Sequence, residues 1–376
     1  MIPYGRQDIS DEDVAAVVEV LKSDWLTTGP AIDRFEQQVA SRCGSAHAAA
    51  VSNGTVALHL ACRALDLGPG DMLWTSPNTF VASANCARYC GAEVDFVDID
   101  SRTYNLSIER LEEKLKKQKP PRILVPVHFA GQPCDMEAIG ELAKRHGFAV
   151  IEDASHAIGA TYKGEPVGNC RHSDITVFSF HPVKIVTSGE GGMALTNRHD
   201  VAGRLAILRT HGITRDPLRM KEGSQGPWYY EQVDLGYNFR LTDIQAALAS
   251  SQLRRMDEFL ARRRELAARY DELLAGLPVI RPHQHPDGVS AWHLYVVQVK
   301  GDRRKIFDVL RANGVGANVH YIPVHLQPYY QGLGFKPGDY PNAEAYYAAA
   351  ITLPLFPRMT DADQDRVVEA LAKALA

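Results

Sequence analysis

One stretch of this sequence organises the rest, and it reads Ser179-Phe180-His181-Pro182-Val183-Lys184-Ile185-Val186-Thr187-Ser188-Gly189-Glu190-Gly191-Gly192-Met193. The β-branched and aromatic residues 175–178 before it predict a buried strand. Residues 193–196 predict a second strand, and the glycines allow the backbone to turn tightly between the two. Lys184 would then lie on a turn between two buried strands. Partial burial there favours the uncharged amine, which can attack a carbonyl or carry a Schiff base. Taken alone, Lys184 is better interpreted as a surface lysine beside a loop.

A second stretch strengthens this interpretation, namely Val150-Ile151-Glu152-Asp153-Ala154-Ser155-His156-Ala157-Ile158-Gly159. Residues 148–151 predict a short strand, so that Asp153 falls at its carboxyl end, the edge at which open α/β sheets bind ligands. An aspartate there can hold the protonated pyridine nitrogen of a cofactor, although aspartates also cap helices and end strands. Asp153 and Lys184 together predict a cofactor site that neither residue predicts alone.

Length and composition set the broad class of the protein. The 376 residues suit two domains, and 45% hydrophobic with 23% charged residues is ordinary for a globular protein. With 41 Lys and Arg against 45 Asp and Glu, and no basic block, we expect no nucleic-acid partner. The first residues lack the pattern of a signal peptide, and no apolar run approaches the roughly 20 residues that span a bilayer. We therefore expect a cytoplasmic protein that does not associate with membranes.

Cysteine and histidine spacing gives no metal signature. The six cysteines are scattered among apolar residues, and cytosolic redox conditions argue against disulfides. Cys86 and Cys90 share a helical face, but small buried hydrophobic residues explain them better than a metal site. His283 and His285, like His320 and His325, lack a carboxylate or cysteine at the spacing of known metal sites. No metal site is expected.

Strands and helices alternate along most of the chain. The sequence predicts helices over residues 11–22 and 31–43, strands over 47–51, 72–75, 93–97, 123–127 and 148–151, and helices over 55–65, 80–89, 107–117 and 135–145 between them. This alternation predicts an α/β fold with a largely parallel sheet covered on both faces. Because crossover connections are right-handed, the carboxyl ends of the strands should meet at one edge.

Two further segments should reach that edge. Ser52-Asn53-Gly54-Thr55 follows a strand and opens a helix, where free amides and the helix dipole can bind an anion. It is not a nucleotide-binding loop, since neither glycine-rich nucleotide motif occurs, and a simple helix cap explains it about equally well. Phe80 follows the next strand and could cover a planar cofactor, but taken alone a core position is the better interpretation.

The second half of the chain predicts a separate, smaller domain. Residues 209–240 form a long segment of low periodicity, and such segments are usually functional or join subunits. Thr242 and Asp243 begin a helix that runs, with breaks, to about residue 275, and the boundary should lie along it. We expect a large domain over residues 1–250 and a small α+β domain over 251–376. Within the latter, the sequence predicts strands over 292–299 and 317–321 and helices over 303–312 and 361–375.

Four motifs in this order resemble the DegT/DnrJ/EryC1/StrS sugar aminotransferases. They are Ser-Asn-Gly-Thr at 52–55, Glu-Asp-Ala-Ser-His at 152–156, Ser-Phe-His-Pro-Val-Lys with Gly-Glu-Gly-Gly within 179–192, and Gly-Tyr-Asn-Phe-Arg at 236–240. The resemblance covers nearly the whole chain, and the lysine motif is specific to that family. It implies the type I (aspartate aminotransferase) fold, pyridoxal 5′-phosphate (PLP) as cofactor, a homodimer, and amination of nucleotide-linked keto-sugars.

The resemblance also implies a role for each matching residue. Lys184 would carry PLP as a Schiff base, Asp153 would pair with the pyridine nitrogen, and Phe80 would stack on the ring. His156, where many members have glutamine, would lie near the phenolic oxygen of the cofactor. The phosphate would be held by a set drawn from two subunits: Gly54, Thr55 and Ser179, joined by Asn238 of the partner subunit. Asn238 could instead cap the helix that begins near Thr242.

Within the family, the chain is most similar to the 4-aminotransferases of pseudaminic acid synthesis. The His-Pro-Val-Lys form and the segments at residues 26–29 and 319–324 carry this similarity. It implies amination at C4 of a UDP-linked 2-acetamido-2,6-dideoxy-4-keto-L-sugar. The residues expected to bind the substrate are Tyr4, Thr28, His181, His320 and Tyr321. Ser188 stands where the family commonly has threonine, which puts the finer sugar contacts in doubt.

The expected reaction moves an amino group from L-glutamate to the sugar, with freed Lys184 acting as general base and acid at the substrate carbon. The sequence does not separate glutamate from glutamine as donor, and another nucleotide 4-keto-sugar remains an alternative substrate. A PLP-dependent sugar 3-dehydratase would have histidine in place of Lys184. A non-catalytic PLP-binding regulator is harder to exclude, but the presence of Lys184, Asp153 and the phosphate site favours an enzyme.

Overall fold

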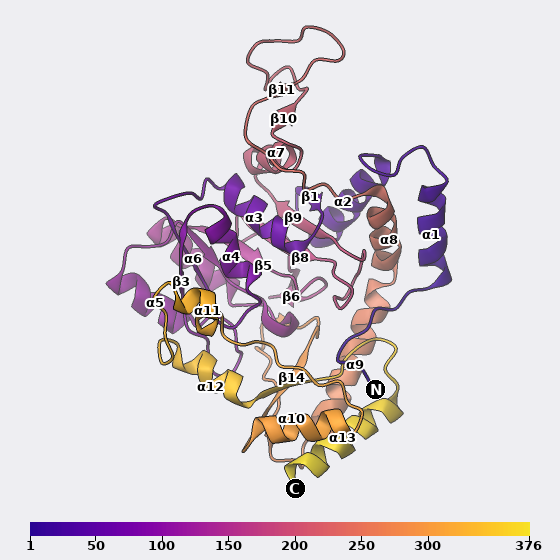
Figure 1. The fold of residues 1–376 in the computed structure, drawn as a ribbon, viewed down its shortest axis with the longest axis vertical. Coiled ribbons are helices and arrows are strands. Elements are labelled where there is room, and N and C mark those ends of the chain that lie inside the picture. The colour runs from indigo at the N-terminus through magenta and orange to yellow at the C-terminus, as the bar shows by residue number, and fades with distance from the viewer.

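The computed structural model describes all of residues 1–376, and its largest element is a seven-stranded sheet (Figure 1). The order across the sheet is β1-β9-β8-β5-β4-β2-β3. The strands are β1 (His47–Val51), β2 (Met72–Thr75), β3 (Glu93–Phe96), β4 (Ile123–Val125), β5 (Ala149–Asp153), β8 (Ile175–Ser179) and β9 (Gly192–Thr196). Only β9 runs antiparallel to its neighbours, so the predicted, largely parallel sheet is confirmed.

Helices cover both faces of this sheet because its strands are apolar on both sides. They are α2 (Pro30–Cys43), α3 (Gly54–Ala64), α4 (Ala82–Tyr89), α5 (Ile108–Lys117), α6 (Met136–His146), α7 (His199–Leu208) and α8 (Asp243–Arg254), and α1 (Asp11–Leu21) packs on the outer side of α8. Along β5, Ile151 packs into the core under α3 and α4, whereas Val150 packs into the core under α5 and α6. The period of two in a strand therefore sends Glu152 and Asp153 to opposite faces.

The last third of the chain builds a second core. Its sheet is antiparallel, with the order β12-β14-β15, and α10 and α13 cover it. The elements are α9 (Met256–Leu273), β12 (Val279–Ile280), β14 (Tyr295–Val299), α10 (Arg303–Ala312), α11 (Pro328–Gln331), α12 (Pro341–Ala349), β15 (Ala350–Leu353) and α13 (Asp361–Leu375). Short strands β6 (Thr161–Tyr162), β7 (Glu165–Pro166) and β13 (Gly288–Val289) form a third small sheet.

The two cores share one helix. The first turns of α9 bury Phe259 and Leu260 against the large sheet, whereas Leu266 and Tyr270 farther along pack into the second core. The chain start also joins the second core, since Ile2 is buried there and pairs with Val315. The division of the chain at residue 250 stays a prediction, and the packing of Ile2 links the chain start to the later part.

Several predicted elements differ from the structure. Residues 317–321 are not a strand, because only Asn318 bridges to a neighbour, Thr352. The strand predicted from residue 292 begins at Tyr295, since Trp292 has a left-handed backbone with φ 49°. The helix predicted to run with breaks after Thr242 is confirmed, as two helices that meet at Arg255 and end at Leu273. Helices α7 and α12 and strand β15 were not predicted.

The long segment of low periodicity projects from the body of the molecule (Figure 1). Between α7 and α8 the chain rises into a narrow arm, in which β10 (Ile213–Thr214) and β11 (Glu231–Gln232) pair with each other. Leu218 and Trp228 on this arm are 94% and 72% exposed. The arm therefore presents large apolar side chains to solvent within a single chain.

Candidate active site

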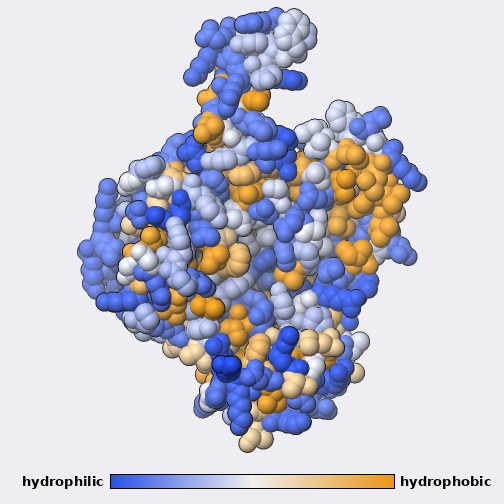
Figure 2. Space-filling view, viewed as in Figure 1, coloured by the Kyte–Doolittle hydropathy of each residue, from blue (hydrophilic) through white to orange (hydrophobic).

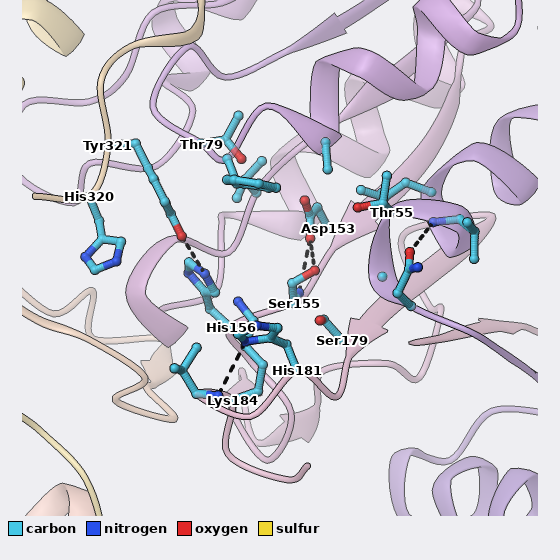
Figure 3. Close-up of a pocket in the computed structure, with 18 of the residues that line it drawn as sticks. Thr55, Thr79, Asp153, Ser155, His156, Ser179, His181, Lys184, His320 and Tyr321 are labelled. Atoms are coloured by element: carbon cyan, nitrogen blue, oxygen red, sulfur yellow. Dashed lines mark hydrogen bonds between the residues drawn. The ribbon is translucent and has the colours of Figure 1, made fainter. Parts of the chain in front are cut away.

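A cavity of about 1090 Å³ opens at the carboxyl edge of the large sheet. Residues following β1, β2, β5 and β8 meet there, as the topology requires. The predicted residues that line it are Tyr4, Gly54, Thr55, Phe80, Asp153, His156, Ser179, His181, Lys184, His320 and Tyr321. Figure 3 shows most of them around one space, with His320 and Tyr321 on the side opposite Asp153 and Ser179. Most of the predicted site residues therefore line one cavity.

Lys184 lies half-buried on the loop between β8 and β9. Burial lowers the pKa of its ammonium from 10.5 to about 8, although the charge of Asp153 acts in the opposite direction. The side chain borders the cavity, so its Nζ is accessible to a ligand. An amine whose pKa is this low has a substantial neutral fraction near neutral pH and can act as nucleophile or base.

Asp153 ends β5, is 5% exposed, and has both carboxylate oxygens occupied by serine donors. Ser83 Oγ donates to Oδ2 at 2.6 Å, and Ser155 Oγ donates to Oδ1 at 2.6 Å. Thr79 Oγ1 lies 2.7 Å from Ser83 Oγ and extends the network. These bonds hold the carboxylate in one orientation at the cavity wall. In this orientation it can accept a hydrogen bond from a protonated ring nitrogen of a ligand.

The start of α3 forms an anion-binding corner. Asn53 caps the helix by accepting a bond from the amide of Val56 at 3.0 Å. The amides of Gly54 and Thr55, in the first turn, have no partner within the helix and lie at the cavity. A Cβ on Gly54 would lie 2.9 Å from the Cβ of Ser179, so only glycine lets these segments approach so closely. The corner fits a phosphate group.

Aromatic and imidazole side chains line the remaining walls. The ring of Phe80 is 57% exposed, which excludes the core position that the sequence alone favoured. His156 is buried, and both burial and the charge of Lys184 hold its pKa well below the usual value. Burial likewise lowers the pKa of His320 to about 3. These imidazoles are therefore neutral and act through hydrogen bonds rather than charge.

Two predicted site residues lie outside this cavity. Thr28 is exposed between α1 and α2, with a left-handed φ of 56°. Asn238 pairs through its backbone with Thr210 at the base of the arm. The next residue, Phe239, does line the cavity, because its carbonyl accepts a 2.9 Å bond from the amide of Ser52. Within one chain, Asn238 is thus near the cavity but not in its wall.

Several residues that line or support the site were not predicted from the sequence. Ser155 lies within the Asp153 motif and could have been noticed as a donor two residues away. Ser83 on α4 gave no sequence signal, since its contact with Asp153 depends on the packing of α4 against the sheet. The six cysteines are all buried and form no disulfide. No group of three or more His, Cys, Asp or Glu side chains is placed to hold a metal ion.

Comparison with known proteins gives a consistent result. The sequence profile of the DegT/DnrJ/EryC1/StrS aminotransferase family matches residues 7–372. The chain is 42% identical over 378 residues to the spore coat polysaccharide biosynthesis protein SpsC of Bacillus subtilis, an alignment that covers 98% of this chain and 96% of SpsC. No helix of the structure combines the length and apolar character needed to cross a membrane.

Solved structures agree with the sequence comparison. Spr1654 of Streptococcus pneumoniae, assigned as a sugar aminotransferase and solved in its PMP form, superposes with a TM-score of 0.92. It is 32% identical, and the match covers 100% of this chain and 99% of that one. PseC of Helicobacter pylori, an aminotransferase of pseudaminic acid biosynthesis, also gives a TM-score of 0.92, at 29% identity and with the same coverage.

Proposed function

The chain belongs to the DegT/DnrJ/EryC1/StrS family and is a PLP-dependent sugar aminotransferase, and from that premise we propose that it aminates C4 of a nucleotide-linked 4-keto-sugar. Its fold is the predicted type I fold of PLP enzymes. The substrate we propose is UDP-2-acetamido-2,6-dideoxy-L-hexos-4-ulose, with L-glutamate as amino donor. The observation that carries the chemistry is the pair of Lys184, with its lowered pKa, and Asp153 in one cavity.

The cavity has groups suited to both the phosphate and the ring of PLP. We assign the phosphate to the amides of Gly54 and Thr55 with the hydroxyl of Ser179, at the corner that a side chain on Gly54 would fill. We assign the ring to the space beside Phe80, and its pyridine nitrogen to Asp153. When bound, PLP supplies an electron sink that stabilises negative charge on the carbon that loses a proton.

The side chains of the chain provide the rest of the chemistry. Lys184 Nζ holds the cofactor at rest, and after release it takes a proton from the substrate carbon and later returns one. Asp153, fixed by two serines, keeps the ring nitrogen protonated. The neutral His156 lies in the same wall, where it adds no positive charge that would repel the ammonium form of Lys184.

The sugar is assigned to the wall opposite the large sheet. Tyr4, His320 and Tyr321 lie there, and His181 borders the cavity beside Lys184. The similarity to PseC, which acts in pseudaminic acid biosynthesis, supports the choice of a UDP-linked 4-keto-sugar. Thr28 is assigned to the substrate by family resemblance alone, because it lies outside this cavity.

We also propose a cytoplasmic homodimer whose sites are shared between subunits. The exposed arm and Asn238 at its base support this, since Asn238 would reach the phosphate of the cofactor in the other subunit. Figure 2 shows apolar residues gathered over the region of α1, where Val14 and Leu21 are 54% and 53% exposed. Apolar surface of this kind favours a second copy of the chain as partner.

Two measurements test the proposed function. Purified enzyme with PLP and L-glutamate should form 2-oxoglutarate in a single turnover, with loss of the absorbance of the bound cofactor. The loaded enzyme is then offered a panel of nucleotide 4-keto- and 3-keto-sugars, and the products are identified by mass, with Lys184→Ala as the inactive control. Amination of the UDP-linked 4-keto-L-sugar is expected. Exclusive amination of a 3-keto-sugar would overturn the proposed substrate, and no reaction with any amino donor would overturn the enzyme assignment.

A further inference from the structure

We propose that Tyr321 determines the selectivity for the sugar, by donating a hydrogen bond from its hydroxyl to an oxygen on or beside the reacting carbon of the keto-sugar. The inference rests on the proposed function, and it assigns one direction to one hydrogen bond in that site. It follows from the hydrogen-bond partners of His156, because they leave only one direction, into the cavity, for the hydrogen of the Tyr321 hydroxyl.

The tautomer of His156 is set by its surroundings. The backbone amide of Ala130 donates to Nδ1 of His156 at 3.3 Å. An amide cannot accept, so Nδ1 carries no hydrogen, and a neutral imidazole then carries its hydrogen on Nε2. The pKa of His156, held low by burial and by the charge of Lys184, agrees with the neutral form. The ring of His293 packs against the His156 ring, with 4.4 Å between centroids and a tilt of 44° between the ring planes.

This tautomer decides the role of the Tyr321 hydroxyl. Its oxygen lies 3.2 Å from Nε2 of His156 (Figure 3). Because Nε2 carries the hydrogen, His156 donates and the oxygen of Tyr321 accepts. The hydrogen of Tyr321 must then point away from His156. The hydroxyl has no other partner in the protein and borders the cavity, so its hydrogen is directed at whatever occupies that space.

The neighbours of Tyr321 do not offer the same fixed donor. In His320, Nε2 lies 3.4 Å from the amide nitrogen of Asn318, and Nδ1 lies 2.8 Å from the hydroxyl of Thr352. The amide oxygen of Asn318 is already bound by the backbone amide of Val319 at 2.8 Å, which fixes its orientation. Both ring nitrogens of His320 therefore have hydrogen-bond partners within the protein. The Tyr4 hydroxyl, with no partner, is free to donate or to accept.

The position of Tyr321 favours the sugar over the cofactor as acceptor. The residues assigned to the cofactor follow strands of the large sheet, whereas Tyr321 comes from the segment between α10 and α11, beside His320. Its ring also lies near that of Phe80, with 6.2 Å between centroids, so Tyr321 borders the space assigned to the cofactor from the side of the sugar. A ligand oxygen that meets a fixed donor must be an acceptor, as a carbonyl oxygen is. A donor in place before the reaction also stabilises the charge that develops on that oxygen, and loss of one such donor typically costs tenfold or more in rate.

The test separates the two half-reactions in Tyr321→Phe. We expect the reaction of the loaded enzyme with the UDP-linked 4-keto-sugar to lose at least about tenfold in kcat/KM. Single-turnover reaction with L-glutamate, and the absorbance maximum of bound PLP, should stay within about twofold of wild type. The matched control is Tyr330→Phe, whose hydroxyl donates to Asn85 at 2.6 Å and lies outside the cavity.

A binding measurement gives a readout that does not depend on turnover. Calorimetric titration of the resting holoenzyme with the UDP-linked 4-keto-sugar should show weaker binding for Tyr321→Phe than for Tyr330→Phe. Equal slowing of both half-reactions, with a shifted absorbance maximum, would mean that the hydroxyl serves the cofactor and would overturn the inference. An unchanged sugar half-reaction would overturn it too, while wild-type amination of the same sugar would leave the proposed function standing. If wild type consumes glutamate but aminates no nucleotide keto-sugar, the proposed function fails and the inference with it.

Discussion

Ser83 donates a hydrogen bond of 2.6 Å to the carboxylate of Asp153 across 70 residues of sequence. Both side chains are buried, and they join α4 to the end of β5. On the opposite face of the same strand, Ser173 donates in the same way to the buried carboxylate of Glu152. One strand thus carries two buried carboxylates, each held by a serine, and only one of them faces the cavity. This arrangement supplies a variant and its matched control.

We expect Ser83→Ala to lower kcat by about tenfold, because Asp153 loses one of the two side chains that orient it, and a bond to a charged group is worth roughly 1.5–3 kcal/mol. Ser173→Ala removes a similar bond from Glu152 and should reduce stability to a comparable extent while leaving kcat within about twofold. Steady-state kinetics and urea denaturation of both variants check this. Equal losses of kcat would show that Ser83 acts only through stability.

Asp153→Asn should lower turnover by several orders of magnitude while PLP still binds through Lys184 and the phosphate corner. The amide cannot keep the ring nitrogen protonated, so the stabilisation of negative charge during the reaction is weakened. Absorbance of the purified variant measures binding of the cofactor, and single-turnover kinetics with glutamate measure the loss. A loss below about tenfold, or about 1.4 kcal/mol of barrier, would make Asp153 a structural residue.

Lys184→Ala should abolish both the absorbance of lysine-bound PLP and turnover with glutamate. Lys184 is the only lysine that lines the cavity, so no other side chain can take its place. The variant should keep the unfolding midpoint of wild-type apoprotein to within a few degrees, since Lys184 is only half-buried. Near-normal turnover of this variant would contradict the central assignment.

The rate at which apoprotein takes up PLP should rise with pH and level off above about pH 8. Burial lowers the pKa of Lys184 to about 8, so below that pH the ammonium form dominates and cannot attack an aldehyde, whereas above it the amine is free. Stopped-flow absorbance between pH 6 and about pH 10 measures the rate. Asp153→Asn removes the charge that raises the pKa of Lys184, and its plateau should begin at lower pH. A wild-type rate that still climbs above about pH 9 would contradict the expected pKa.

Mixing two inactive variants tests the shared site. Lys184→Ala and an Asn238 variant with severe loss of activity should regain part of the wild-type activity on subunit exchange. If each site is built from both subunits, one site of the mixed dimer contains both substitutions and the other site contains neither. If Asn238 serves its own subunit, every site carries a lesion. Failure to regain activity, with mixed dimers shown by mass spectrometry, would contradict the shared site and leave the PLP chemistry intact.

The amino-acid sequence by itself determined the alternating strands and helices, the direction of most of the sheet and the roles expected of Lys184 and Asp153. These features are local, since an apolar run, a cap such as Thr242 or a turn glycine acts within a few residues. The carboxyl ends of parallel strands must share an edge, so the sequence alone predicts that Gly54, Phe80 and Asp153 lie at one edge, where all three line the cavity.

Only the tertiary structure decided which distant side chains complete the site. Ser83 meets Asp153, and Tyr321 meets His156, because separate elements pack together, and no local pattern encodes such a contact. The segment at 317–321 has the composition of a strand, but it lies irregularly at the cavity, where packing outweighs β-propensity. The direction of the Tyr321 hydroxyl could not be predicted from the sequence at all. It depends on the position of the backbone amide of Ala130, which only the folded chain fixes.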